Sequence, residues 1–274
     1  MNKTPIISLL TDFGVKDAYV GCMKGVVLSI CPYARIIDIT HEIPKFNIRY
    51  GAFVLMQTVP YFPEGTIHIA VVDPGVGTKR RPIIIETNRC YYVGPDNGLL
   101  ILSSKREGIR HVYNITNQQF MLPKISKTFH GRDIFSCVAA HIATGIYPSE
   151  FGPEICDYVS IKFTKPWKNG KTLYGEIIHI DSFGNIVTNI SLEDLEKEGI
   201  SKGRYFFMKL RDKILKLKLC STYSEVPIQS PLTIIGSSNF LEVSVNQGNA
   251  SKTFNTKIGD LIIISLELDS VGFR

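Results

Sequence analysis

Short apolar runs alternate with amphipathic stretches over the part of the chain before residue 165. Five runs have the length and composition of buried strands: residues 5–11, 35–40, 66–72, 82–86 and 90–93. Apolar residues at helical spacing predict helices over residues 17–30, 47–61 and 132–144. Asp17 and Asn47 are N-cap residue types, and Gly145 suits a helix end. This alternation predicts an α/β domain with a largely parallel sheet.

The pattern changes at residues 165–171. Strand-like runs separated by turn residues then follow: 172–180, 204–210, 213–219, 232–235 and 240–245. Ser191-Leu192-Glu193-Asp194 has the form of a capping box and predicts a short helix. Several short strands in succession are typical of a small antiparallel barrel or sandwich. We therefore expect an α/β domain over residues 1–168 and a smaller all-β, barrel-like domain over residues 169–274.

The composition is that of a globular protein, with 44% hydrophobic and 20% charged residues in 274. No apolar stretch approaches the ~20 residues that span a bilayer, and the first apolar run is too short for a signal peptide. The six cysteines show no CxxC spacing and are interpreted as reduced thiols. We expect a cytoplasmic protein without a membrane partner.

The net charge of +6 leaves nucleic acid, a membrane surface or an anionic substrate open. Basic residues are spread along the chain, with one triplet at Lys79-Arg80-Arg81. No aromatic RNA-binding signature accompanies that triplet, so we expect no nucleic-acid partner. A solvated surface of mixed charge is the favoured interpretation.

Polar clusters directly after two predicted strands are candidate ligand sites, because ligands of open α/β sheets bind beyond the carboxyl ends of strands. Asp12, in Thr11-Asp12-Phe13-Gly14, suits a pair of ligand hydroxyls. Asp73 is followed by Pro74-Gly75, a tight turn in which Gly75 is free to take positive φ and which brings Arg80 back toward Asp73. A carboxylate that caps a strand beside a surface basic patch is the alternative interpretation of this cluster.

Two more clusters lie later in the chain. His130 precedes Gly131 at a predicted helix start, where free backbone N–H groups and a glycine allow a ligand to approach. Asp181, Phe183 and Asn185 fall in one turn and can hold an amine and a ring, although an ordinary turn between strands has the same composition. HExxH, GxSxG and a helix-opening GxGxxG are missing, so we expect no metal site, serine nucleophile or dinucleotide fingerprint.

Together these clusters resemble the S-adenosyl-L-methionine (SAM) hydroxide adenosyltransferase family, the SAM hydrolases related to bacterial fluorinases and chlorinases. The resemblance covers nearly the whole chain and rests on seven motifs in order. They are L-T-D-F-G-x-x-D-x-Y-V-G, D-I-T-H-E-I-P, V-V-D-P-G-V-G-T-x-R-R, G-P-D-N-G, T-F-H-G-R-D, D-x-F-G-N-x-x-T-N-I, and Ser237-Ser238-Asn239-Phe240-Leu241-Glu242 with Asn246. Each motif alone is weak, but the seven in this order are specific.

The resemblance implies an N-terminal α/β domain, a C-terminal β-barrel domain and a homotrimer. The ligand is then held between the N-terminal domain of one subunit and the C-terminal domain of its neighbour. The family's hydrolases carry an Asp-Arg-His set that maps to Asp73, Arg80 and His130. Halogenases lack this set, so its presence favours water over halide as the nucleophile. SAM is the substrate, and no cofactor is implied.

Substrate-binding roles also follow from the resemblance alone. Asp12 would hold the ribose hydroxyls, and Phe46 would flank the sugar or adenine. Asp181 would bind the methionine amino group, with Phe183 and Asn185 near the adenine. Ser238 and Asn246 lie in the segment that closes the far side of the site.

The function predicted in this way is hydrolysis of SAM to adenosine and L-methionine by SN2 attack of water at C5′. Methionine leaves as a neutral thioether, so the reaction needs a positioned nucleophile and a proton acceptor but no general acid. We expect Asp73 and Arg80 to orient the water and stabilise charge, and His130, with an ordinary pKa near ~6.5, to position it and accept its proton. The alternatives are a SAM-dependent halogenase of the same fold and a non-catalytic protein that binds SAM or adenosine.

Overall fold

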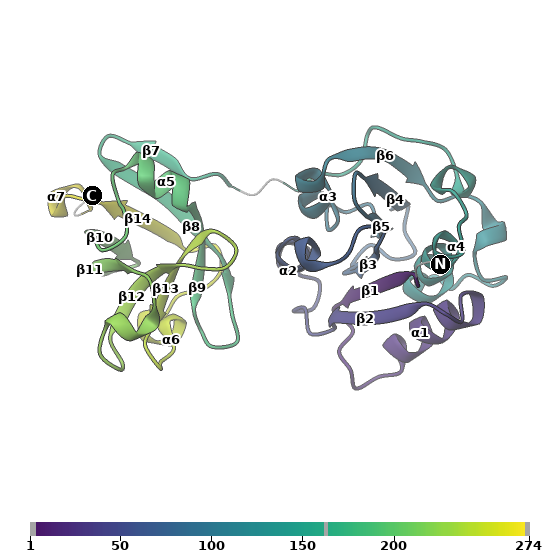
Figure 1. The fold of residues 1–274 in the computed structure, drawn as a ribbon, viewed down its shortest axis with the longest axis horizontal. Coiled ribbons are helices and arrows are strands. Elements are labelled where there is room, and N and C mark those ends of the chain that lie inside the picture. The colour runs from purple at the N-terminus through teal and green to yellow at the C-terminus, as the bar shows by residue number, and fades with distance from the viewer. Residues whose placement is uncertain (1–3, 162–163, 272–274) are drawn as a thin grey trace. The chain divides into compact units, whose positions relative to one another are not determined.

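The computed structural model describes residues 4–161 and 164–271. The chain divides into two compact parts, residues 1–161 (the N-terminal unit) and residues 162–274 (the C-terminal unit). Each unit is described by itself (Figure 1).

A six-stranded sheet in the order β2-β1-β3-β5-β4-β6 forms the N-terminal unit. Its strands are β1 Ile6–Thr11, β2 Arg35–Thr40, β3 Ile67–Val71, β4 Pro82–Thr87, β5 Tyr91–Pro95 and β6 Ile109–Asn114. The strands β2, β1, β3 and β5 pair in parallel, whereas β4 pairs antiparallel with both β5 and β6. The expected largely parallel sheet is therefore wrong, and the sheet is mixed. Residues 88–90 alone join β4 to β5, and so short a link makes a hairpin, because a parallel pair needs a long crossover.

Helices cover both faces of this sheet. They are α1 Tyr19–Ile30, α2 Ile48–Thr58 with the 3-10 turn η1 Val59–Tyr61, α3 Ile101–Glu107, and α4 Cys137–Ala143, which continues a π-helical segment η3, Gly131–Ser136. Short 3-10 turns, η2 Gln118–Phe120 and η4 Pro148–Phe151, complete the unit. Figure 1 shows α2 and α3 on the opposite side of the sheet from α4.

The helix caps were predicted with mixed success. Asn47 caps α2 as expected, since its side chain accepts a hydrogen bond from the Tyr50 N–H. Asp17 does not cap α1, whose N-cap is Ala18 and has no side-chain hydrogen bond. The core beneath α1 and α4 includes Val27, Phe135 and Leu9, all fully buried.

A closed barrel forms the C-terminal unit. Its strands are β7 Trp167–Asn169, β8 Thr172–Ile180, β9 Ile186–Ser191, β10 Tyr205–Leu210, β11 Lys213–Cys220, β12 Pro231–Ile235, β13 Phe240–Val245 and β14 Leu261–Ser265. Among the described residues, β8 to β14 close a seven-stranded ring because β14 pairs with both β10 and β8. One pair, β11 with β12, is parallel, and the others are antiparallel. The expected small all-β barrel is confirmed.

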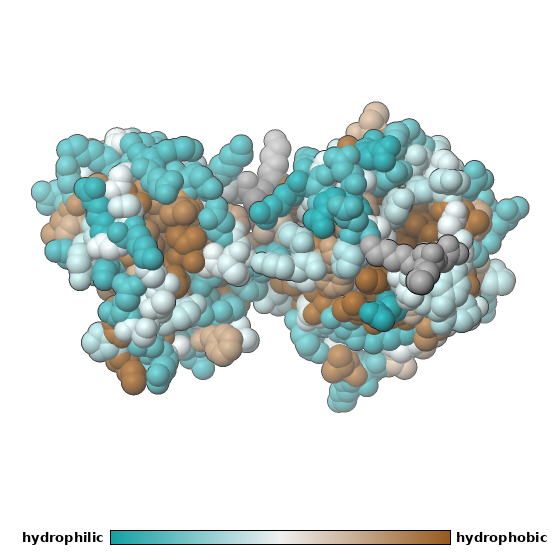
Figure 2. Space-filling model, viewed as in Figure 1, coloured by the Kyte–Doolittle hydropathy of each residue, from teal (hydrophilic) through white to brown (hydrophobic). Residues whose placement is uncertain are grey.

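Short helices decorate the barrel: α5 Leu192–Lys197, η5 Tyr223–Glu225, α6 Ala250–Phe254 and α7 Leu268–Val271. The expected capping box opens α5, with Ser191 and Asp194 bonded reciprocally. Within the described ranges 4–161 and 164–271, no helix has both the length and the apolar character needed to cross a membrane. Figure 2 shows hydrophilic side chains over much of the visible face of each unit, interrupted by hydrophobic patches.

Candidate active site

Three neighbouring parallel strands end in carboxylates at one edge of the N-terminal sheet. Asp12 follows β1, Asp73 lies just beyond β3, and Asp96 follows β5. The register pairs Thr11 with Val71, so β1 and β3 end side by side. Asp96 is used structurally, because Oδ2 accepts from the Arg81 guanidinium at 2.7 and 3.0 Å and Oδ1 accepts from the Val159 N–H at 2.8 Å.

The turn after Asp73 returns the chain toward that carboxylate. The Val76 N–H donates to the Asp73 carbonyl at 3.3 Å, and the Thr78 N–H donates to the Gly75 carbonyl at 3.2 Å. Gly75, which is free to take positive φ, does not do so, and Gly77 takes it with φ of 77°. A Cβ at Gly77 would lie 2.1 Å from the Lys127 carbonyl oxygen, so the position requires glycine.

Asp73, Arg80 and His130 are brought together by this turn. Arg80 Nε donates to Asp73 Oδ1 at 3.1 Å, and Arg80 Nη2 donates to Asp73 Oδ2. The same Nη2 lies 3.0 Å from His130 Nδ1. The side chains of Arg80 and Asp73 are only 7% and 4% exposed, and the guanidinium lies over the Phe135 ring at 5.4 Å. The structure therefore joins the three predicted catalytic residues in one hydrogen-bonded network, in which the Asp73 and Arg80 side chains are buried and His130 is half-buried.

Burial shifts the pKa values of His130 and Asp73 in this network. Desolvation lowers the pKa of His130, and the neighbouring Arg80 charge lowers it further. Desolvation raises the pKa of Asp73, and it outweighs the opposing effect of Arg80. Because arginine only donates, His130 Nδ1 must be an acceptor toward Arg80, and the neutral ring carries its proton on Nε2.

Asp133 supports this network and was missed as a functional candidate. It is fully buried, Oδ2 accepts from the Ser126 N–H at 2.7 Å, and Oδ1 accepts from Arg132 Nε at 2.6 Å. It thereby fixes the segment whose Lys127 carbonyl packs against Gly77. The available signal was the final aspartate of T-F-H-G-R-D, a carboxylate followed by the apolar residues Ile134 and Phe135.

Asp12 and Phe46, two predicted substrate-binding residues, also lie together. Asp12 is 6% exposed and its Oδ2 accepts from the Phe46 N–H at 2.8 Å, while Lys45 Nζ donates to the Asp12 carbonyl. Phe46 has φ of 64° and is 68% exposed. The carboxylate therefore holds an aromatic side chain on the surface in a left-handed backbone conformation that is rare outside glycine.

In the C-terminal unit, one turn joins Asp181, Phe183 and Asn185. Asp181 Oδ1 accepts from the N–H groups of Phe183 and Asn185 at 2.9 and 2.8 Å, and Oδ2 accepts from Asn185 Nδ2 at 2.9 Å. Phe183 is 76% exposed. An ionised carboxylate has about four lone-pair sites, so Oδ2 can accept a further donor.

The last two predicted binding residues, Ser238 and Asn246, have different surroundings. Ser238 is half-buried in the turn between β12 and β13. Asn246 holds a neighbouring loop, because its Nδ2 donates to the Val226 carbonyl at 2.8 Å and its N–H to the Ser230 carbonyl at 3.0 Å. Both of these bonds are structural.

Glu242 and Tyr223 were missed by the sequence analysis. Burial raises the pKa of the Glu242 carboxyl, and the nearby Asp181 charge raises it further. The Tyr223 hydroxyl donates to Glu242 Oε2 at 3.4 Å. Glu242 ends the motif Ser237 to Glu242, so the sequence displayed the residue but not its proximity to Asp181.

Among residues 4–161 and 164–271, no group of three or more His, Cys, Asp or Glu side chains is arranged to hold a metal ion.

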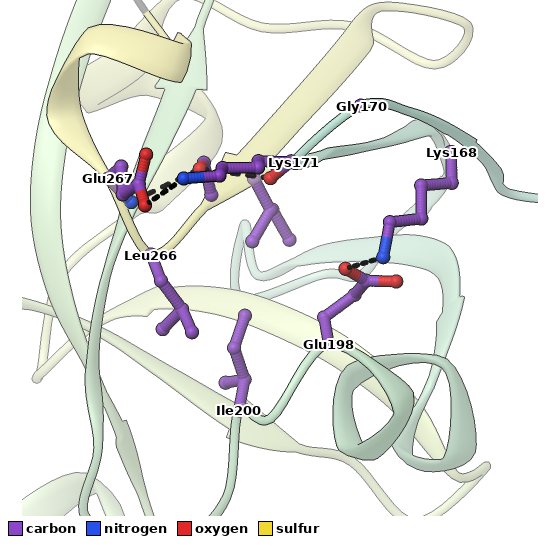
Figure 3. Close-up of a pocket in the computed structure, with 9 residues that line it drawn as sticks. Lys168, Gly170, Lys171, Glu198, Ile200, Leu266 and Glu267 are labelled. Atoms are coloured by element: carbon purple, nitrogen blue, oxygen red, sulfur yellow. Dashed lines mark hydrogen bonds and ion pairs between the residues drawn. The ribbon is translucent and has the colours of Figure 1, made fainter.

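A pocket of the C-terminal unit is lined by two ion pairs, Lys168 with Glu198 and Lys171 with Glu267, both at 2.7 Å (Figure 3). It contains none of the predicted site residues, and its charges are already paired.

The protein is of a two-domain class. A mixed α/β unit carries the hydrogen-bonded Asp-Arg-His network, and a seven-stranded barrel unit follows it. Residues 7–152 match the SAM hydroxide adenosyltransferase N-terminal domain, and residues 175–263 match the C-terminal domain of the same family. The chain belongs to the SAM hydroxide adenosyltransferase family.

Similar proteins come from archaea and bacteria. An (R)-S-adenosyl-L-methionine hydrolase of Methanocaldococcus jannaschii is 40% identical, over 94% of this chain and 95% of the relative. A fluorinase of Actinoplanes is 29% identical, over 96% of this chain and 98% of the relative. The crystal structure of an uncharacterized conserved protein from Thermotoga maritima, 37% identical, superimposes with a TM-score of 0.91 over 94% of this chain and 99% of that one.

Proposed function

We propose that this protein is an enzyme that hydrolyses S-adenosyl-L-methionine to adenosine and L-methionine. The observation that carries the proposal is the buried hydrogen-bonded set Asp73, Arg80 and His130. Hydrolases of the family at 34–40% identity support the same activity, whereas the fluorinase relatives are 25–29% identical.

In the proposed reaction, a water oxygen attacks C5′ of the substrate. The new C5′–O bond forms as the C5′–S bond breaks, and the sulfur takes the bonding pair and leaves as the neutral thioether of methionine. The water loses one proton, so the balanced products are adenosine, methionine and a proton. A dry site favours the step, because a hydroxide-like oxygen and a sulfonium cancel each other's charge.

The hydrogen bonds suggest a separate catalytic role for each of the three residues. Arg80 donates to His130 Nδ1, so neutral His130 offers its Nε2–H to the water oxygen and positions it. This arrangement argues against the expectation that His130 accepts the proton, because its Nδ1 lone pair is engaged. We assign proton acceptance to Asp73, whose pKa is raised by burial, and electrostatic stabilisation of the developing hydroxide to Arg80.

The substrate-binding assignments stay proposals. Asp12 would bind the ribose hydroxyls and Phe46 would flank the sugar or adenine, supported by the hydrogen bond from the Phe46 N–H to Asp12. Asp181 would bind the methionine ammonium, with Phe183 and Asn185 near the adenine. Ser238 and Asn246 would close the far side. Glu242 places a second carboxyl group close to Asp181, and an ammonium group bound there would favour its ionised form.

We further propose a homotrimer with each site completed by a neighbouring subunit, and a cytoplasmic location. The exposed aromatic rings of Phe46 and Phe183, one in each unit, support binding surfaces that are covered in the assembly. The six cysteines are free thiols, which is typical of a reducing compartment. No cofactor, nucleic acid or membrane is required by this proposal.

Purified full-length protein incubated with SAM tests the activity, with adenosine and methionine measured by chromatography. Equimolar release of both products is the expected result. Parallel reactions with chloride or fluoride test the halogenase alternative, which requires a halogenated nucleoside that depends on the halide. Binding of SAM without product over hours would identify a non-catalytic binder and would contradict the proposal.

A further inference from the structure

Three polar side chains form a chain of contacts that begins next to Asp12. Thr11, the last residue of β1, is fully buried, and its Oγ1 lies 2.9 Å from His41 Nδ1. His41 is 4% exposed and directly follows β2, the strand that pairs with β1 (Figure 1). Its Nε2 lies 3.1 Å from Asp38 Oδ1, in an ion-pair contact rather than a well-aligned hydrogen bond. Neither Thr11 nor His41 has a role in the reaction proposed above.

The hydrogen positions in this chain of contacts follow from the carboxylate at its end. Burial alone would raise the pKa of Asp38, but contacts with Lys24, at 2.6 Å, and with His41 outweigh it and lower the pKa. The ionised carboxylate favours the neutral His41 ring with its proton on Nε2, which leaves Nδ1 as an acceptor. The Thr11 hydroxyl therefore donates to His41 Nδ1, and its oxygen accepts from the Phe13 N–H at 3.2 Å.

Backbone hydrogen bonds join the same two segments on both sides of Asp12. The Gly14 N–H donates to the His41 carbonyl at 2.7 Å, and the Ile43 N–H donates to the Thr11 carbonyl at 3.4 Å. Residues before and after Asp12 are thus both held by the segment that follows β2. The side-chain contact between Thr11 and His41 is the buried link of this arrangement.

Asp12 keeps one carboxylate oxygen for a ligand. Its Oδ2 accepts from the Phe46 N–H at 2.8 Å. Its Oδ1 has no hydrogen-bond donor among the described residues and is not fully buried, so a ligand hydroxyl can reach it. Because a displacement of about 1 Å can remove most of the benefit of an oriented group, the position of the turn decides how well this oxygen meets a ligand.

We propose that His41 is a positioning residue for ribose binding. Through Thr11 it fixes the turn that carries Asp12, so that the Asp12 carboxylate meets the ribose hydroxyls of the substrate. His41 itself does not touch the substrate. The inference rests on the role in ribose binding that is proposed above for Asp12.

Isothermal titration calorimetry of the full-length protein with two nucleosides tests the proposal. Adenosine is compared with 2′,3′-dideoxyadenosine, which lacks both ribose hydroxyls. We expect the wild-type protein to bind adenosine at least about tenfold more tightly, because the hydroxyls donate to a carboxylate. Asp12→Ala should remove most of this preference.

Variants of the two positioning side chains should reduce the same preference. Thr11→Val and His41→Leu should each lower it about threefold or more, through weaker binding of adenosine, and leave the affinity for dideoxyadenosine within about twofold. His41→Asn, whose Oδ1 can replace Nδ1 as the acceptor, should retain most of the preference. If His41→Leu fails to fold, Thr11→Val still carries the test, because valine keeps the shape of the buried threonine.

Thr40→Val is the matched control. Thr40 ends β2 as Thr11 ends β1, and its Oγ1 likewise accepts from the N–H two residues later, that of Glu42, at 3.1 Å. Within the described residues its hydroxyl makes no bond to the His41 ring. We therefore expect Thr40→Val to keep the wild-type preference for adenosine.

Unchanged preference in both Thr11→Val and His41→Leu, or equal weakening of both nucleosides, would overturn the inference, since the second result is that of a purely structural role. Full preference retained in Asp12→Ala would instead contradict the role of Asp12, and with it the inference. Failure of the proposed hydrolysis would appear separately, as the absence of product from SAM, because these titrations measure binding and not turnover.

Discussion

Arg80 Nη2 lies 3.0 Å from His130 Nδ1, while the same guanidinium pairs with Asp73. Because the guanidinium has donors only, the imidazole must be the acceptor in this contact. One arginine therefore fixes the orientation of the histidine and neutralises the aspartate. The geometry makes Arg80 the centre of the proposed water-activating network.

Replacing Arg80 with lysine should abolish this double contact. A lysine ammonium is a point charge on a flexible stem and cannot reproduce the planar fork, so we expect kcat to fall about 100-fold with a smaller change in KM. Arg81→Lys is the matched control, because Arg81 pairs with Asp96 and Asp157. Steady-state kinetics on both variants measures the difference. Equal losses in the two variants would argue against a special role for Arg80.

Asp73→Ala and His130→Ala should lose turnover while they still bind SAM, since neither residue is assigned to substrate binding. Equilibrium dialysis with labelled SAM measures binding, and adenosine release measures turnover. Full turnover retained in either variant would contradict the assignment of that residue to the reaction.

The dependence of the rate on pH should show one acidic limb. The pKa of His130 is lowered from 6.5, so the ring is already neutral at pH 7, and Asp73 must be ionised to accept a proton. We therefore expect kcat to be constant from about pH 7 to 9 and to fall at pH values below 6.5 as these groups become protonated. A profile of kcat against pH checks this. A rate that rises through pH 7 to 8 would contradict a lowered pKa for His130.

Gly77→Ala should destabilise the fold and reduce activity. The substitution forces alanine to φ of 77° and places its Cβ against the Lys127 carbonyl, for a cost of at least about 2 kcal/mol. Gly65→Ala is the control, with φ of 80° and open space around its Cβ, and it should cost about 1 kcal/mol with normal kcat. Urea unfolding and kinetics compare the two. Similar stability losses would show that the Lys127 contact is unimportant.

His68 should make stability depend on pH. It is fully buried, its Nδ1 lies 2.6 Å from Ser8 Oγ, and burial lowers its pKa from 6.5 to about 3. Below pH 6.5, His68 binds a proton in the unfolded chain but not in the folded chain. The free energy of unfolding therefore decreases as the pH falls from 6.5 toward 3. At pH 4.5 this loss amounts to about 2.5 kcal/mol relative to pH 7.

His68→Gln should remove that part of the pH dependence, because glutamine can bond Ser8 but does not titrate. His111→Gln is the control, since His111 is 40% exposed and pairs with Glu154. Urea unfolding at pH 7 and pH 4.5 measures the difference between the variants. Parallel pH dependence in wild type and His68→Gln would disprove the assignment to His68.

Local patterns predicted the elements that carry the site better than the way in which they are arranged. Features that depend on a few neighbouring residues could be predicted from the sequence. They are the strands that end near Asp12 and Asp73, the Asn47 cap and the Ser191 capping box. The short helix α3 was missed, since seven residues give too little periodicity. The reversed direction of β4 was missed because the apolar run that marks a buried strand is the same in either direction, whereas the three-residue link to β5 sets the direction.

The candidate site was also predictable only in part, in its residue identities but not in its contacts. The identities of Asp73, Arg80 and His130 follow from the sequence motifs, but their shared hydrogen bonds depend on the Gly77 turn, which packs against the carbonyl of Lys127, a residue distant in the chain. The closeness of Glu242 to Asp181 likewise depends on the pairing of β13 with β9, in which Glu242 lies opposite Val187, and these strands are far apart in the sequence.

Hydrolysis in ¹⁸O-labelled water tests the central claim most directly. If water attacks C5′, mass spectrometry will find one ¹⁸O atom in adenosine, at the 5′ hydroxyl, and none in methionine. Unlabelled adenosine, label in methionine, or release of adenine in place of adenosine would contradict attack at C5′ by a water held at Asp73, Arg80 and His130.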